Sequence, residues 1–275
     1  MKNVILFLAG LLLAAGIYYY LTAKDRQSGP TVVELPPAEE QESARSTPTK
    51  YPVAPPSTAE NPLENVPDEA AMPPEPLPAL DESDAMLAGV VGALLDAERF
   101  GELLIFDSFI RHLVVSIDNL TAAKVPVKSR VNTPPAGEFL VRKESGDAES
   151  AVLDPANYQR YTRYVEMLES MDPDGVVRIY SHFYPLFQEA YESLGYPDRY
   201  FNYRMVEVID TLLVTPEIDE PVRLLQPAVL YTYADPRLEA LSAGQKMLLR
   251  TGPENGRRLR LLLQEYRRQI TALSE

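Results

Sequence analysis

Hydrophobic residues recur with a helical period through residues 172–215, and this stretch predicts two antiparallel helices joined by a turn at residues 195–198. Asp172 and Pro173 suit the start of the first helix, because an aspartate caps free N–H groups and a proline at the first position loses no hydrogen bond. Gly195 suits the left-handed residue that ends it. The apolar half of this helix is expected to comprise Val176, Val177, Ile179, Tyr180, Phe183, Tyr184, Leu186, Phe187, Tyr191 and Leu194.

The second helix of this pair is expected to begin near residue 198 and to end at residues 215–216, where a threonine precedes a proline. One side of it is apolar and needs cover from other parts of the chain, because a helical hairpin cannot bury such a face alone. The residues expected to be buried there are Phe201, Met205, Val208, Ile209, Leu212 and Leu213.

Other segments repeat the helical spacing of apolar residues. They predict helices at residues 87–95, 109–117, 154–168, 235–248 and 252–273. The acidic run at residues 81–84 is expected to supply caps and helix-dipole charge to the first of these.

A minor β element is also expected. Residues 138–143 and 150–153 flank a Ser-Gly-Asp turn and predict a β-hairpin. Residues 222–226 predict a third strand, which Pro227 bars from continuing as a central strand, and residues 228–233 fit helix or strand. The sequence therefore predicts a mainly α fold, α+β with a minor hairpin or small sheet, in a single helical domain at residues 77–275.

Two segments precede this domain. Residues 4–23 form an apolar run without a charge, long enough for a helix to cross a hydrocarbon core of about 30 Å. We interpret residues 1–23 as an N-terminal transmembrane anchor. The rival interpretation is a cleaved signal peptide, but the run is long for one and Leu21-Thr22-Ala23 makes a poor cleavage site.

Orientation in the membrane is nearly balanced, because Lys2 and the amino terminus oppose Lys24 and Arg26 across the apolar run. We favour export of the C-terminal part, since a three-residue tail precedes the run and a long domain follows it. Residues 24–76 form a linker that we expect to be disordered, because it combines many prolines and glutamates with low hydrophobicity. Its reach lies between about 40 Å as a coil and about 170 Å in extended polyproline form.

Charge and cysteine content exclude several classes of protein. The net charge of −14 argues against a nucleic-acid partner, because phosphate binding requires a dominant positive surface. The absence of cysteine excludes disulfides, thiol nucleophiles and thiolate metal sites.

Four stretches of the chain resemble a known family. They are LPALDESDA at 77–85, LDPANYQRY at 153–161, YPLFQEAYESLGYPDRYFNYRMVEVIDTLL at 184–213 and LEALSAGQKMLLRTGPEN at 238–255. On these residues the chain resembles the bacterial family called Domain of Unknown Function 3014. The resemblance implies a membrane-tethered envelope protein of a Gram-negative type of bacterium, and it brings no established activity or catalytic residues.

Residues that commonly perform catalysis or bind metals are sparse. His112 and His182 lie far apart and have no neighbouring ligands at metal spacing. His182 beside Glu189 or Glu192 is one candidate general base, but a solvated residue on the helix edge is the simpler interpretation. Residues 172–175 superficially resemble a calcium loop, yet they lack its further ligands, and helix capping explains them better. We predict neither a cofactor nor a metal site.

Eleven tyrosines fall between residues 158 and 233, in a chain without tryptophan. Such a density suits either bulky core-edge residues or a phenol-lined groove for a glycan or an extended peptide. The candidate binding face is the polar side of the second hairpin helix, where Glu207 and Asp210 are possible acid–base or cation-binding groups. This polar face comprises Tyr200, Tyr203, Arg204, Glu207 and Asp210.

The last predicted helix carries Arg257, Arg260, Arg267 and Arg268 opposite its apolar stripe. An anionic lipid or an acidic partner would suit these cations, but neutralisation by the chain's own acidic surface is the simplest interpretation. Leu261 lies on the same face without an evident role.

These features favour a non-catalytic interaction or scaffold module. We expect a single-pass inner-membrane protein, anchored by residues 4–23, whose C-terminal domain lies in the periplasm and meets an envelope protein or a cell-wall partner. The alternative is a cell-envelope enzyme, or a glycan or peptide binder, that uses the tyrosine- and carboxylate-lined face.

Overall fold

The computed structural model describes residues 76–126, 128–143, 150–218, 221–227 and 230–273. Within these ranges no helix is both long and apolar enough to cross a membrane. The anchor predicted at residues 4–23, and the linker predicted at 24–76 except its last residue, lie outside the described residues.

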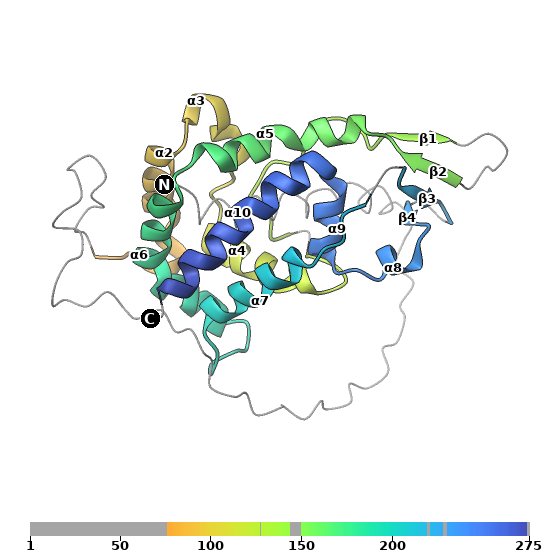
Figure 1. Cartoon of the computed structure of the whole chain (residues 1–275). Coiled ribbons are helices and arrows are strands. Elements are labelled where there is room, and N and C mark those ends of the chain that lie inside the picture. Colours follow the sequence, from red (N-terminus) through yellow and green to blue (C-terminus); the bar gives the residue numbers. More distant parts are fainter. Residues whose placement is uncertain (1–75, 127, 144–149, 219–220, 228–229, 274–275) are drawn as a thin grey trace, which may run out of the picture.

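The described part of the chain is mainly helical, as predicted (Figure 1). Its α-helices are α2 (Asp84–Leu94), α3 (Ala97–Phe100), α4 (Phe109–Asp118), α5 (Ala156–Ser170), α6 (Pro173–Glu192), α7 (Phe201–Leu213), α8 (Pro236–Glu239), α9 (Ala243–Arg250) and α10 (Pro253–Ala272). Short 3-10 turns are η2 (Leu80–Glu82), η3 (Gly101–Leu103) and η4 (Asn119–Thr121). The strands are β1 (Val141–Lys143), β2 (Ser150–Leu153), β3 (Arg223–Leu225) and β4 (Thr232–Tyr233).

The predicted helical hairpin is present as α6 and α7. The Asp172 side chain accepts a hydrogen bond from the backbone N–H of Gly175 at 3.0 Å, and Gly195 adopts a φ of 101°. The start predicted for α7 near residue 198 is wrong, because the helix begins at Phe201. The side chain of Gln188 on α6 fixes that start: its oxygen accepts from Phe201 N–H and its nitrogen donates to the Arg199 carbonyl, both at 2.8 Å.

The hairpin forms the centre of the main core. Phe187 on α6 stacks against Phe201 on α7, with ring centroids 5.9 Å apart and planes 6° from parallel. Helix α6 packs against α2 and α4, while α10 runs across α5, α6 and α7 (Figure 1). The apolar half predicted for α6 is largely buried, but Leu194 just beyond it is 38% exposed.

Two expectations about helix ends are wrong. The predicted helix at 235–248 is interrupted, because Ser242 and Gln245 form a reciprocal capping box that starts α9 as a separate helix. The acidic run at 81–84 supplies helix-dipole charge, since Asp84 lies in the first turn of α2, but it does not cap its own helix through a side chain. Instead the Asp84 carboxylate accepts from the N–H groups of Ser108 and Phe109, at 2.6 and 2.9 Å, and so caps α4.

The predicted hairpin belongs to a larger antiparallel sheet, in the order β1-β2-β3-β4. Strand β3, predicted at 222–226, lies inside this sheet, and Pro227 comes after its last residue. The sheet stands at the end of the molecule where α5 begins (Figure 1). One face of it covers a second, smaller core built around Leu153, Val222, Leu224 and Tyr233.

Candidate functional site

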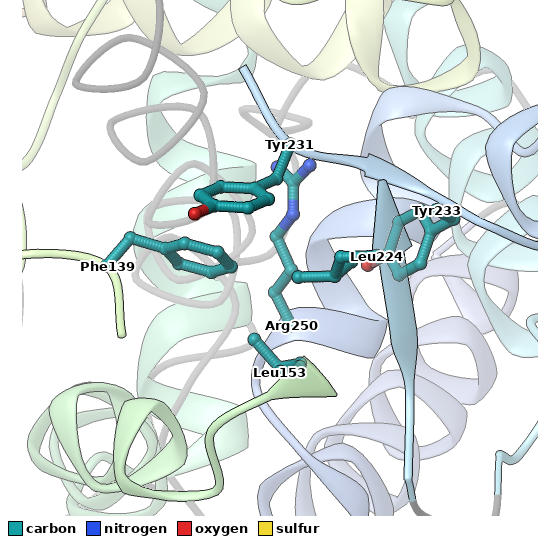
Figure 2. Close-up of a pocket in the computed structure, with 6 residues that line it drawn as sticks. All are labelled: Phe139, Leu153, Leu224, Tyr231, Tyr233 and Arg250. Carbon is teal, nitrogen blue, oxygen red and sulfur yellow. The ribbon is translucent and has the colours of Figure 1, made fainter. Parts of the chain in front are cut away.

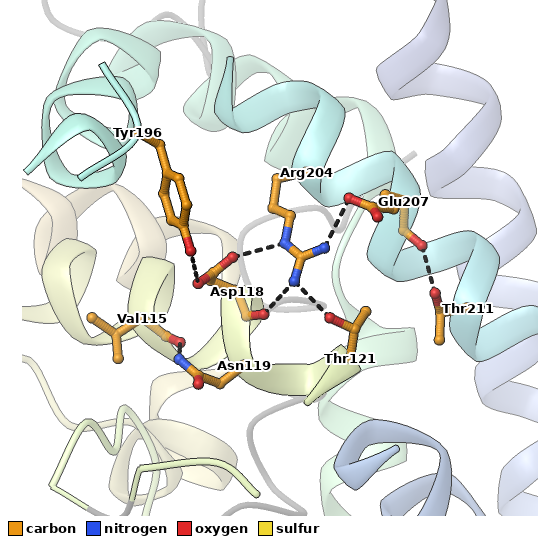
Figure 3. A network of polar contacts seen from close by, with 8 residues as sticks. All are labelled: Val115, Asp118, Asn119, Thr121, Tyr196, Arg204, Glu207 and Thr211. Atoms are coloured by element: carbon orange, nitrogen blue, oxygen red, sulfur yellow. Dashed lines mark hydrogen bonds and ion pairs between the residues drawn. The ribbon is translucent and has the colours of Figure 1, made fainter. Parts of the chain in front are cut away.

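The polar side of α7 does not form one continuous site. Arg204 points inward toward α4 and η4, where it donates to the Asp118 carboxylate at 2.7 Å and to the Thr121 hydroxyl at 2.6 Å (Figure 3). It also donates to the Asp118 backbone carbonyl and, at 2.8 Å, to Glu207. Tyr196 donates to the other oxygen of Asp118 at 3.4 Å. This set of contacts ties the hairpin to α4.

Electrostatics explain why this arginine stays charged. The side chains of Arg204 and Asp118 are only 17% and 14% exposed. Burial lowers the pKa of Arg204, but the hydrogen bond that it donates to Glu207 and the negative charge of Asp118 raise the pKa by more, so the net shift is upward. The guanidinium therefore serves to join α7 to α4 rather than to meet a ligand.

The other residues of the predicted face divide between two surroundings. Asp210 accepts two hydrogen bonds from Arg267 on α10 and so joins these two helices. Glu207 keeps 66% of its side chain exposed despite its pair with Arg204. Tyr200, 41% exposed, lies with its ring centroid 6.4 Å from that of Tyr203. Tyr200 and Glu207 are the exposed part of the predicted face, whereas Tyr203 is half-buried and its hydroxyl is enclosed.

The C-terminal arginines are neutralised within the chain, as predicted. Arg257 pairs with Glu254 at 2.7 Å, and Arg268 pairs with Glu265. Arg260 lies 3.8 Å from a Glu217 oxygen and donates to the Thr215 carbonyl at 3.1 Å. An anionic lipid is therefore not needed to explain these cations.

Several surface carboxyl groups have pKa values below their ordinary range because arginines donate hydrogen bonds to them. Hydrogen bonds from Arg111, Arg237, Arg257 and Arg268 lower the pKa of Asp81, Asp235, Glu254 and Glu265, respectively. A general acid at neutral pH requires the opposite shift, which burial produces. These four carboxyl groups are suited to ion pairing.

The two histidines lie on different helices. His182 lies half-buried on α6, and this burial lowers its pKa. His112 lies on α4. No group of three or more His, Asp or Glu side chains in the described ranges can hold a metal ion. At the predicted helix cap, the Asp172 carboxylate accepts from the Gly175 N–H. The Asp174 carboxylate accepts from the Gln269 side chain at 3.1 Å.

A pocket beneath the sheet was not anticipated as a site. It is lined by Phe139, Leu153, Leu224, Tyr231, Tyr233 and Arg250 (Figure 2). The rings of Phe139 and Tyr231 lie 5.9 Å apart at an angle of 42°, and the Arg250 guanidinium carbon lies 5.9 Å from the centre of the Tyr233 ring. Two of these residues, Tyr231 and Tyr233, belong to the tyrosine-rich part of the sequence. Nothing in the sequence distinguished Arg250 from the other arginines. We call this the sheet pocket.

A second cavity of about 70 Å³ adjoins the same small core. Its walls include Tyr158, Ile218, Val222 and Leu249, and Glu217 and Arg260 contribute its charged groups. This volume is enough for several water molecules.

Comparison with known protein families identifies one that matches this chain. A protein-family model described as "Protein of unknown function (DUF3014)" matches residues 109–267. The matched range begins at the first residue of α4 and ends within α10, so it contains the Arg204 contacts and the sheet pocket. No curated protein and no solved structure matches the chain.

Proposed function

The chain belongs to the DUF3014 family, and we propose that it is a tethered interaction module of the bacterial cell envelope. Its anchor is the apolar segment 4–23, and residues 24–76 are a spacer between this anchor and the helical domain. The domain is exported and lies in the periplasm. The family supplies no reaction, so the proposal rests on the surface of the described domain.

The observation that carries this proposal is the exposure of two apolar side chains, one directly after α7 and one on α10. Val214 is 73% exposed and Leu261 is 67% exposed, more than any other large apolar side chain in the described ranges. The hydrogen bond from Arg260 to the Thr215 carbonyl brings the segments that carry them together. Apolar side chains within a charged surface are typical of sites where another protein docks.

We define the α7–α10 face as Tyr200, Glu207, Val214 and Leu261. Val214 directly follows α7, seven residues after Glu207, and its N–H still bonds the Asp210 carbonyl, so it continues the side of the helix that carries Glu207. Ion pairs beside this face, such as Arg257 with Glu254, give it a polar rim. An apolar centre with a polar rim is the usual composition of a protein–protein interface.

One observation favours the alternative, a glycan or peptide binder. Tyr200 and Tyr203 place two phenol rings 6.4 Å apart at the start of α7, one of them 41% exposed. Exposed tyrosine rings offer an apolar surface with a polar tip, which suits sugars as well as peptides. Glu207, one helical turn beyond Tyr203, would then supply the hydrogen-bond acceptor.

The proposed topology leads to a test in living cells. A fusion of alkaline phosphatase to Glu275 is expected to be active, because that enzyme requires export, whereas a reporter that works only in the cytoplasm is expected to be inactive at the same position. The mature protein should retain its first residues. The opposite reporter pattern, or a mature protein that begins near Lys24, would contradict the proposed anchor.

The proposed docking face leads to a second test. A photo-crosslinking amino acid placed at Val214 or Leu261 in the full-length chain is expected to trap a discrete adduct in intact cells. The same amino acid at Leu140, which is 44% exposed on the sheet, is the matched control and should not trap it. Leu261→Asp should remove the Val214 adduct while changing stability by no more than about 0.5 kcal/mol. Equal adducts from all three positions, or from none, would count against the face.

A further inference from the structure

Arg250 has unusual surroundings for an arginine of an acidic protein. Most arginines of the described ranges lie within ion-pair distance of a carboxylate, as Arg258 does with Glu169 and Arg267 with Asp210. Arg250 is half-buried and forms no ion pair with any carboxylate in those ranges. Its side chain contacts Tyr233 through a hydrogen bond, and its guanidinium carbon lies 5.9 Å from the centre of the Tyr233 ring.

The fold compensates this charge only in part. Arg250 ends α9, where the helix dipole favours a cation. The Tyr233 ring adds a cation–π attraction. A side-chain hydrogen bond to Tyr233 uses part of the guanidinium. No carboxylate in the described ranges accepts from its paired N–H donors, whose geometry matches a carboxylate. In a chain with 40 acidic residues, a half-buried arginine without a described carboxylate partner therefore retains the capacity to bind an anion.

The walls around Arg250 determine which anion fits. Phe139, Tyr231 and Tyr233 present rings, while Leu153 and Leu224 close the floor with apolar atoms (Figure 2). A single guanidinium balances one negative charge, so a monoanion suits this pocket better than a phosphate dianion. The apolar and aromatic walls suit an apolar body attached to that anion.

A buried hydroxyl lies near the same group. Tyr161 is 2% exposed, and its hydroxyl has no hydrogen-bond partner among the described residues. Burial raises the pKa of Tyr161 to about 12, while the charges of Arg160 and Arg250 oppose this rise. Its hydroxyl is thus a second polar group, within the electrostatic reach of Arg250, that the fold leaves unsatisfied.

We propose that the sheet pocket binds a monoanionic carboxylate carried on an aromatic or bulky apolar body, with Arg250 receiving the carboxylate and the rings of Phe139, Tyr231 and Tyr233 holding the body. Such a group exists as a free aromatic acid or as the last residue of a peptide. The site lies at the sheet, apart from the α7–α10 face, so it does not depend on the proposed docking function.

The sheet pocket is small in the described state, with a volume of about 10 Å³. That is room for about one water molecule. Binding of the body therefore requires the pocket to widen, and we place this movement at the Phe139–Tyr231 ring pair, which lines it. Both residues are half-buried at the rim of the small core, where fewer contacts oppose such a movement than in the main core.

Isothermal titration calorimetry of the full-length chain in a mild detergent tests the proposal. The probes are phenylacetate, N-acetyl-L-phenylalanine and their uncharged amides. We expect at least one acid to bind, and its amide to bind about tenfold more weakly or not at all, because only the acid carries the charge that Arg250 recognises. Binding of phenylacetate points to a free acid as the source, and binding of N-acetyl-L-phenylalanine alone points to a peptide end.

Variants of Arg250 separate recognition from folding. Arg250→Gln is expected to weaken acid binding by about tenfold or more, and Arg250→Lys to weaken it less, because lysine keeps the charge but not the paired donors. Arg199→Gln is the matched control, since Arg199 also lies over a ring, 5.7 Å from the centre of Tyr196, but outside the pocket. It should leave binding unchanged.

Circular dichroism melting of each variant establishes that the fold is retained, and Arg250→Lys keeps the test decisive if Arg250→Gln does not fold. Equal affinity for acid and amide would overturn the proposal. So would unchanged binding by a folded Arg250→Gln, or the absence of binding by either acid at about 10 mM.

Discussion

Replacing Gly252 with alanine is expected to destabilise the domain by about 2–5 kcal/mol. Gly252 precedes α10 with φ 86° and ψ 167°, a backbone conformation that is essentially reserved for glycine. A Cβ at this position would lie 2.3–2.6 Å from three atoms of the Tyr158 ring. Chemical denaturation of the full-length chain, followed by circular dichroism, measures the effect.

Gly195→Ala is the matched control for this substitution. Gly195 also has a positive φ, 101°, but no atom lies within 4 Å of the position its Cβ would take. Its replacement should cost about 1–2 kcal/mol, from the backbone alone. If both alanine variants lose the same stability, the contact with Tyr158 is not what makes Gly252 necessary.

A double-mutant cycle isolates the ring contact. Tyr158→Ala removes the ring that the new Cβ would meet, so Gly252→Ala should cost less in that background than in the wild type. The difference in unfolding free energy measures the steric conflict between α5 and the start of α10. Additive effects would show that the two positions act independently.

The sequence predicts those parts of the fold whose signals are local. Asp172 and Gly195 mark the ends of α6 within a few residues of it, and the apolar spacing locates its buried side. The start of α7 could not be predicted in this way. Its cap is the side chain of Gln188, thirteen residues before Phe201.

The candidate site depends even more on distant residues. Arg204 and Asp118 are 86 residues apart, and only the packing of α7 against α4 brings them together. A helical wheel places Arg204 on the polar side of α7 but does not reveal that a second helix covers this position. The sheet pocket likewise combines residues from before β1 to the end of α9, with Arg250 supplied from outside the strands.

Replacing Arg204 with methionine is expected to destabilise the domain by about 2–4 kcal/mol. Methionine keeps much of the side-chain volume but leaves the Asp118 carboxylate, 14% exposed, without its cation. The Thr121 hydroxyl loses its donor as well. Removal of one partner of a buried pair costs more than removal of both, so adding Asp118→Asn to Arg204→Met should restore part of the stability.

Glu207→Gln is the matched control on the same side of α7. Glu207 also bonds Arg204, but its side chain is 66% exposed, so the expected change is no more than about 0.5 kcal/mol. Asp210→Asn should be similarly mild, because that carboxylate is 47% exposed. If both variants fold normally yet lose the adduct trapped at Val214, the exposed carboxylates take part in recognition. If Glu207→Gln is as destabilising as Arg204→Met, then Glu207 is an integral part of the Arg204–Asp118 contacts and is not free to meet a partner.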